Sequence, residues 1–109
     1  EYSLAHYNVA VQLSEQDQPE EAIHHYQKAL HLEPTNAFAS LGIANTLELT
    51  GNYEAALKIY ENVMQSIPEI KGVVDKIQVL KRKETEAQQT RIHKEMQELK
   101  EAQNNYLEW

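Results

Sequence analysis

The five histidines are the first side chains to consider for chemistry, since the chain has no cysteine to act as a nucleophile or a metal ligand. His24 and His31 lie seven residues apart and could share one face of a helix. Lys28, however, stands four residues after His24, where a third ligand would be needed. The sequence also lacks the His-Glu-x-x-His zinc motif, a glycine-rich phosphate loop and the Gly-x-Ser-x-Gly turn of a nucleophile. We therefore predict no metal site, no cofactor and no enzymatic activity.

The length and charge of the chain exclude several further classes of protein. Its 109 residues allow one small domain, which is too short for a two-lobed enzyme or a doubly wound dinucleotide-binding fold. The net charge of −7 argues against nucleic-acid binding, and no apolar run approaches the roughly 20 residues that span a membrane. Since the chain starts at Glu1 and not at a methionine, we expect an excised piece of a longer protein. The start has no signal-peptide pattern, so we expect a cytoplasmic protein, unless the targeting segment lies outside this piece.

The elements that must position any binding residue follow from an internal repeat of 34 residues. Shifting the sequence by that number aligns small, apolar and helix-ending residues: Val9 with Ile43, Ala10 with Ala44, Leu13 with Leu47, Glu20 with Glu54, Ala22 with Ala56, Ile23 with Leu57, Tyr26 with Tyr60, and Pro34 with Pro68. Most of these positions decide how helices pack, so the match predicts two copies of one structural unit.

Each unit is expected to be a pair of antiparallel helices with recognisable ends. Pro19 suits the first position of a helix, where its missing N–H group costs nothing, and Pro34 and Pro68 end the second helix of each unit. Gly51 suits the left-handed residue after a helix, and Asn52 suits the cap of the next one. Between these ends, apolar residues recur every three or four positions and give each helix a buried face.

Both units share a run of small, aromatic and proline residues. The run is Ala22, Tyr26, Ala29 and Pro34 in the first unit and Ala56, Tyr60, Val63 and Pro68 in the second. It resembles the tetratricopeptide repeat (TPR) family over about residues 3–70, with departures at His6, Asp17 and Ser40. The resemblance implies an all-α fold of antiparallel helix hairpins, a segment of an α-solenoid, with repeat 1 over 1–36 and repeat 2 over 37–70.

The residues after the second repeat differ in composition. Residues 1–70 carry 2 basic and 10 acidic side chains, whereas residues 71–109 carry 8 basic and 7 acidic ones. We expect a capping helix over 71–81, because the last repeat cannot bury its own outer face, and then a long charged helical extension over 82–109. Apolar residues spaced by 4, 3 and 7 along the extension predict a short coiled coil: Ile92, Met96, Leu99 and Tyr106. This series is either a surface that associates helices into a homo-oligomer or part of a solvated tail.

The resemblance also implies a groove, since in this family the first helices of successive hairpins line a concave surface. The residues implied to face it are Leu4, Tyr7, Val11, Phe38, Leu41 and Asn45, with Glu15 and Glu48 near the rim. Neither first helix contains Lys or Arg, so we expect an apolar floor without basic residues. Co-chaperone members of the family instead use basic residues to clamp a partner's C-terminal carboxylate. A helical or apolar peptide suits this floor better, unless a further repeat or the tail covers it.

The sequence therefore predicts a non-catalytic protein-interaction module, a scaffold or adaptor that binds a protein or peptide and neither nucleic acid nor membrane. The alternative is a self-assembly element, because two repeats are few for a stable unit and the C-terminal helix could join two chains. Neither the partner nor the biological process follows from such a fold.

Overall fold

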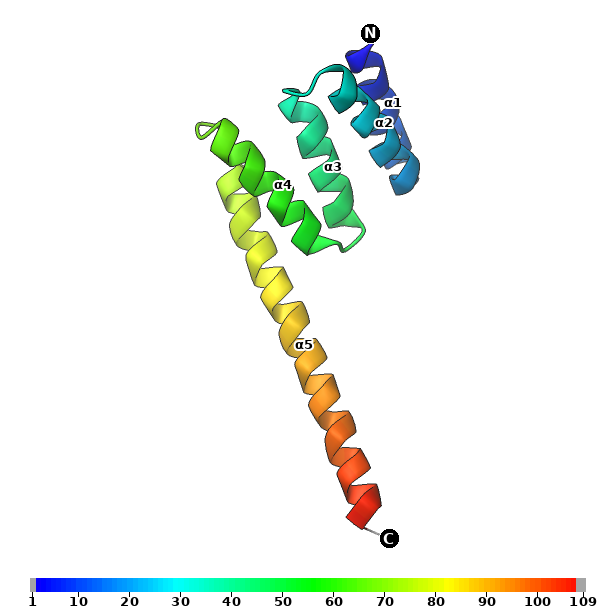
Figure 1. The fold of residues 1–109 in the computed structure, drawn as a ribbon, viewed down its shortest axis with the longest axis vertical. Helices are drawn as coiled ribbons and strands as arrows, with labels where there is room; N and C mark the ends of the chain where they lie inside the picture. Colours follow the sequence, from blue (N-terminus) through cyan, green and yellow to red (C-terminus); the bar gives the residue numbers. More distant parts are fainter. Residues whose placement is uncertain (1, 108–109) are drawn as a thin grey trace.

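Helices in succession make up the fold, as Figure 1 shows. The structure is a computed structural model that describes residues 2–107. Two helix hairpins are followed by a much longer helix: α1 (Ser3–Glu15), α2 (Pro19–Leu32), α3 (Ala37–Leu49), α4 (Tyr53–Ser66) and α5 (Val73–Leu107). The described residues contain no strand. The predicted all-α fold of helix hairpins with a long C-terminal helix is confirmed.

The predicted helix ends agree with the structure at the prolines. Pro19 is the first residue of α2. Both α2 and α4 end two residues before a proline, at Leu32 and Ser66. The residue that precedes a proline is restricted to extended backbone, and this restriction stops both helices.

The two hairpin turns follow the same backbone path although their sequences differ. Gly51 has a φ of 84°, and Asp17, its counterpart one repeat earlier, has a φ of 60°. In both turns the next amide donates to the carbonyl oxygen five residues back at 2.9 Å. Aspartate is among the few residues that tolerate this left-handed conformation, which explains why Asp17 can stand where the family usually has glycine.

The asparagine caps differ from the sequence prediction. Asn52 precedes α4 as predicted, but its side chain makes no capping hydrogen bond. Asn36, which the sequence pattern did not indicate, caps α3 because its side-chain oxygen accepts a hydrogen bond from the Ala39 amide at 3.2 Å. The hairpins are therefore joined by a capped helix start at α3, where the chain passes from one repeat to the next.

Two buried clusters hold the helices together. The first joins α1, α2 and α3 around Tyr26, and the second joins α3, α4 and α5 around Tyr60. The alanines in these clusters are wholly buried: Ala10, Ala22, Ala29, Ala39, Ala44 and Ala56. Alanine lets helix backbones approach closely, so that the Tyr26 ring fills the space between the two hairpins and the Tyr60 ring fills the space between the second hairpin and α5.

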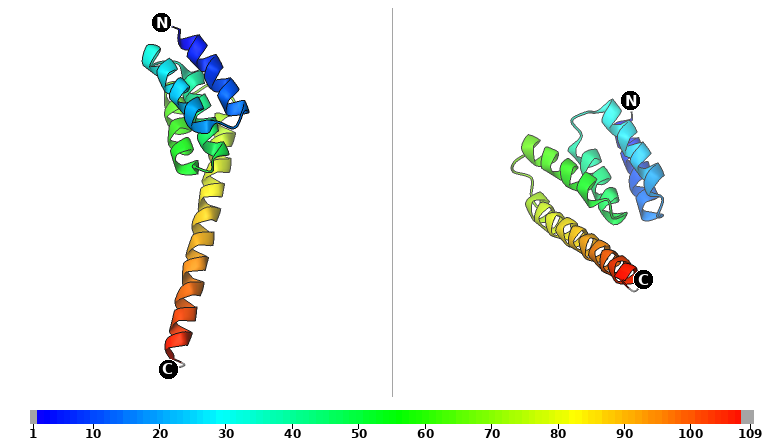
Figure 2. Two further views of the ribbon diagram at one scale, coloured as in Figure 1. Left: turned by 90° about the vertical axis from the view of Figure 1, so that its right-hand side faces the viewer. Right: turned by 60° about the horizontal axis from the view of Figure 1, so that its bottom comes forward.

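The helix α5 covers the second hairpin with its first turns and then leaves it. Val73, Ile77 and Leu80 are buried in the second cluster, whereas every described residue from 85 to 107 is exposed. Figure 2 shows α5 extending far beyond the hairpins. The radius of gyration is accordingly 19.2 Å, against about 13 Å for a compact domain of this length. None of the described helices, α5 included, is both long enough and apolar enough to cross a lipid bilayer.

The predicted capping segment and the predicted extension thus share one unbroken helix. No break occurs near residue 81, where the sequence composition suggested a division. Residues 108 and 109 of the extension lie outside the described residues. How the chain divides into functional units remains a proposal.

Candidate functional site

A groove of about 500 Å³ lies between α1, α3 and the beginning of α5. Five of the six residues implied by the family resemblance line it: Tyr7, Val11, Phe38, Leu41 and Asn45. The sixth, Leu4, lines an adjoining hollow together with Tyr7 and Phe38, so the two hollows share residues. The first helices of both hairpins therefore contribute to one surface, and α5 adds a third wall.

Two apolar side chains of this surface are open to solvent. Phe38, near the start of α3, is 71% exposed, and Leu4, on the first turn of α1, is 70% exposed. Tyr7 is half-buried and packs against Tyr26, with 5.7 Å between the ring centroids. A ligand can therefore cover Phe38 and Leu4 without disturbing the core, whereas Tyr7 also supports the core.

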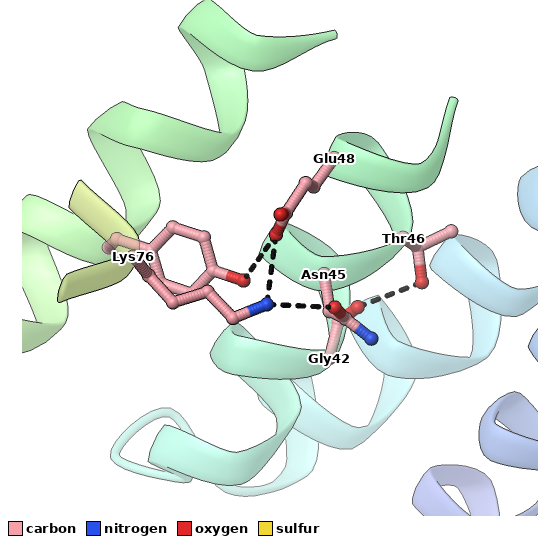
Figure 3. Close-up of polar contacts among 6 residues, drawn as sticks. Gly42, Asn45, Thr46, Glu48 and Lys76 are labelled. Carbon is pink, nitrogen blue, oxygen red and sulfur yellow. Dashed lines mark hydrogen bonds and ion pairs between the residues drawn. The ribbon is translucent and has the colours of Figure 1, made fainter. Parts of the chain in front are cut away.

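The part of the groove next to α5 is polar, as Figure 3 shows. Lys76 Nζ lies 3.1 Å from Glu48 Oε2 and 3.5 Å from Asn45 Oδ1. The Tyr60 hydroxyl donates to the same Glu48 oxygen at 3.3 Å. Glu48 therefore contacts a cation and accepts a hydrogen bond from a phenol, and these contacts offset its charge beside the groove.

The two buried tyrosines have raised pKa values. Burial, the nearby charge of Glu48 and the hydrogen bond to it raise the pKa of Tyr60 to about 12. Burial also raises the pKa of Tyr26, and Tyr7 and Glu15 add to the effect. Both phenols therefore stay protonated at neutral pH, and Tyr60 can donate its hydrogen bond to Glu48.

The histidines of the first hairpin lie outside this groove. His6 Nδ1 and His25 Nδ1 are 3.1 Å apart and their rings are stacked. His24 and His31 line a surface hollow together with His6. Burial is the main cause that lowers the pKa of His25, and Lys28, His6 and His24 also lower it. In the described part of the chain, no three His, Asp or Glu side chains come together as metal ligands would.

Comparison with known proteins decides the family of these hairpins. Residues 13–71, just over half of the chain, match the tetratricopeptide repeat family. The chain belongs to the tetratricopeptide repeat family. It is also similar to lipopolysaccharide assembly protein B of Haemophilus influenzae, with 46% identity over 48 residues. That stretch is 44% of this TPR chain and 12% of the relative, so the chain spans a small part of the relative's length.

Membership of the TPR family implies a protein–protein interaction module, and the family is typically non-catalytic. The groove between the first helices of the hairpins is the surface that the family resemblance implied for binding. The structure supplies such a groove with exposed apolar side chains.

The groove residues on α1 and α3 include no Lys or Arg, but the groove as a whole is not free of basic residues. Lys71 and Lys76 also line the groove, because its third wall comes from beyond the second TPR. A signal for this wall is present in the sequence: continuing the 34-residue period aligns Ile77 with Ile43 and Lys76 with Gly42. The beginning of α5 thus takes the place that the first helix of a third TPR would take.

The four residues predicted for helix association lie on the distal half of α5. They are each more than half exposed, and they are Ile92, Met96, Leu99 and Tyr106. The part of α5 that carries them is exposed throughout, and none of them lines the groove. The structure therefore separates the two sets of candidate residues into two surfaces of this TPR chain.

Proposed function

We propose that this chain is a non-catalytic scaffold or adaptor in the cytoplasm, whose groove binds an amphipathic helix or an apolar peptide of a partner protein. The observation that carries this proposal is the exposure of Phe38 and Leu4 beside the half-buried Tyr7, Val11 and Leu41. Apolar side chains gathered on a concave surface fit the apolar face of a peptide helix.

The distribution of apolar and polar residues in the groove supports an amphipathic ligand. The apolar residues lie on α1 and α3, whereas Lys76, Glu48 and Asn45 form a polar border next to α5. A peptide with one apolar face can bury that face against the apolar residues of α1 and α3. Its hydrogen-bonding groups can then lie over the polar border next to α5.

A clamp for a C-terminal carboxylate fits this groove less well. Such a clamp needs cations that are free to pair with the ligand. Of the two lysines that line the groove, Lys76 already pairs with Glu48 and also contacts Asn45, which leaves Lys71 alone for a ligand. We therefore expect the affinity of a peptide to be the same whether its C-terminus is a free carboxylate or an amide.

The relative's name refers to lipopolysaccharide assembly, but the similarity supports only the protein-binding part of the proposal. The matched stretch is 12% of that protein, and in this chain TPR hairpins make up most of residues 13–71. Binding of lipopolysaccharide is therefore not part of the proposal.

Phe38→Ala tests the groove, with Leu49→Ala as its matched control. Both residues lie on α3 and are 71% and 72% exposed, but Phe38 lines the groove and Leu49 does not. The probes are amphipathic helical peptides selected by display on the wild-type protein, and fluorescence anisotropy measures their affinity. We expect Phe38→Ala to weaken binding about tenfold or more, because anchoring aromatic residues carry much of the energy of an interface.

Leu49→Ala should leave the affinity unchanged, and both variants should unfold at the temperature of the wild type. Equal losses of affinity in the two variants would contradict the groove as the binding site. Failure to select any binding peptide would contradict the proposal as a whole.

Self-assembly through α5 is the second candidate function. The observation that favours it is the exposed apolar series on the distal half of the helix: Ile92, Met96, Leu99 and Tyr106. Large apolar side chains that line up on one helix face are typical of a surface that another helix covers. The two candidate functions use separate surfaces, so one chain can perform both.

A further inference from the structure

The distal half of α5 is a helix without cover in the described chain. Ile92 and Met96 are 56% and 54% exposed, and Leu99 and Tyr106 are 68% and 79% exposed. The first turns of α5 are fixed on α4 through Val73, Ile77 and Leu80, so they supply the nucleus from which the helix continues. The apolar face therefore lies on a helix whose first turns are already stabilised by the folded hairpins.

The spacing of the apolar residues fits a coiled-coil seam. In a heptad written abcdefg, Ile92, Leu99 and Tyr106 fall at position d, and Met96 and Gln103 fall at position a. Apolar residues at a and d make the contact between two coiled helices, and a polar residue at a single a position favours one register. The seam thus has the features that align two helices with each other.

The charges beside this seam are complementary in one orientation only. Positions g hold Gln88, Glu95 and Ala102, and positions e hold His93, Lys100 and Leu107. In a parallel pair, each g position faces the e position five residues later in the other chain, so Glu95 faces Lys100 twice. In an antiparallel pair g faces g and e faces e, and neither set contains opposite charges.

We propose that the distal half of α5 pairs with the same segment of a second copy of this chain, as a parallel, in-register coiled coil. This inference rests on the self-assembly candidate among the proposed functions and specifies its arrangement. The occupant of the apolar face is a second copy because the charges at e and g complement one another within this sequence. The ion pairs direct the orientation, and the apolar side chains supply the contact area.

The parallel arrangement has a consequence for the groove. With 3.6 residues per turn, the apolar series lies roughly 90° around α5 from the face packed on α4 and roughly 160° from Lys76, which borders the groove. The pairing surface therefore points away from the groove. A parallel pair holds two hairpin units at the same end of the coiled coil, with both grooves open, so that a partner with two binding segments gains avidity.

Cysteine cross-linking tests the orientation, since the chain contains no cysteine of its own. Gln103→Cys places a thiol at position a, where the two copies face each other in a parallel, in-register pair. Glu101→Cys, at the outer position f, is the matched control. In a glutathione redox buffer we expect the first variant to form a disulfide dimer at least about tenfold faster than the second.

Light scattering of the wild-type chain over a dilution series accompanies this test and separates the two levels of the inference. If the wild-type chain dimerises but Gln103→Cys does not cross-link faster than Glu101→Cys, the parallel pairing is wrong. Self-assembly itself would still hold in that case. A wild-type chain that remains monomeric up to about 100 µM would overturn both. Neither outcome affects peptide binding by the groove, which is measured on the monomer.

Charge exchange tests the same pairing independently. Glu95→Lys and Lys100→Glu each place like charges opposite each other in a parallel pair, so each variant alone should dimerise about tenfold more weakly. An equimolar mixture of the two variants restores both opposite-charge pairs, and sedimentation should show a mixed dimer as tight as the wild type. Both side chains are exposed, so unfolding of the hairpins should stay the same. A mixture no tighter than either variant alone would overturn the proposal.

Discussion

The two halves of α5 carry the same apolar spacing in opposite surroundings. Both series have intervals of 4 and 3 residues, but the proximal series is buried against the second hairpin and the distal series is more than half exposed. The spacing shows which residues share a helix face, and the neighbouring elements decide whether that face is covered. The two series are Val73, Ile77 and Leu80 in the proximal half, and Ile92, Met96 and Leu99 in the distal half.

The largest expected effect tests this difference with one substitution at two positions. Leu80 is wholly buried, and Leu80→Ala should lower the free energy of unfolding by about 2–5 kcal/mol through lost burial and the cavity left behind. Leu99 is 68% exposed, and Leu99→Ala should change the free energy of unfolding by less than about 0.5 kcal/mol in a monomeric sample. Denaturant unfolding followed by circular dichroism at low micromolar concentration measures both.

Raising the protein concentration sharpens the comparison between these two leucines. If two copies pair through α5, the wild type gains apparent stability with concentration and Leu99→Ala gains less. Leu80→Ala should remain destabilised at every concentration. Equal destabilisation by the two substitutions in dilute samples would mean that the distal half is covered within a single chain.

The hairpins could be predicted from the sequence because their packing residues recur in register. Tyr26 and Tyr60 occupy the same place in successive units, and the alanines around them fall at matching positions. The first hairpin turn was less predictable from the sequence, because Asp17 has the positive φ that Gly51 has one repeat later. The backbone conformation is the same in both, and only the structure shows that aspartate adopts it.

The groove could be predicted only in part, because its third wall depends on a contact between distant residues. The groove residues of α1 and α3 could be predicted from the family resemblance. Lys76 stands in a charged segment and pairs with Glu48, which precedes it by 28 residues. The 34-residue period indicates that the beginning of α5 forms this wall, but the contacts of Lys76 with Glu48 and Asn45 follow only from the fold.

A smaller effect should have opposite signs in the two regions. Gly42 lies in α3 against the buried ring of Tyr26, and a Cβ atom there would overlap that ring. Gly42→Ala should therefore destabilise the chain by about 1–3 kcal/mol through overpacking, although alanine is the better helix former by about 1 kcal/mol. Thr90, in the distal half of α5, is exposed, so Thr90→Ala should slightly raise the helix content.

Thermal unfolding measures the first substitution, and the far-ultraviolet circular dichroism signal measures the second. A stabilised Gly42→Ala chain would show that Tyr26 moves aside at little cost. The contrast between a tightly packed hairpin region and an open distal helix would then be weaker than the burial values indicate.

The smallest expected effect concerns pH and belongs to the hairpin region. Burial is the main cause that lowers the pKa of His25, Lys28, His6 and His24 add to it, and Glu21 opposes it. The unfolded chain therefore takes up a proton at His25 at a higher pH than the folded chain does. The contribution of neutral His25 to the free energy of unfolding is therefore fully present above about pH 6.5, the ordinary pKa of histidine. This contribution falls as the pH is lowered below that value.

The contact between His6 and His25 adds to the effect of burial on this pH dependence. With the two Nδ1 atoms 3.1 Å apart, one nitrogen donates and the other accepts, so a proton on the accepting nitrogen would remove this hydrogen bond. Melting temperatures between about pH 7.5 and 5 should fall for the wild type and fall less for His25→Gln. His24→Gln, which replaces the exposed neighbour, should keep most of the fall. If His24→Gln abolishes the fall and His25→Gln keeps it, the proton uptake takes place on the outer face of α2 and not between α1 and α2.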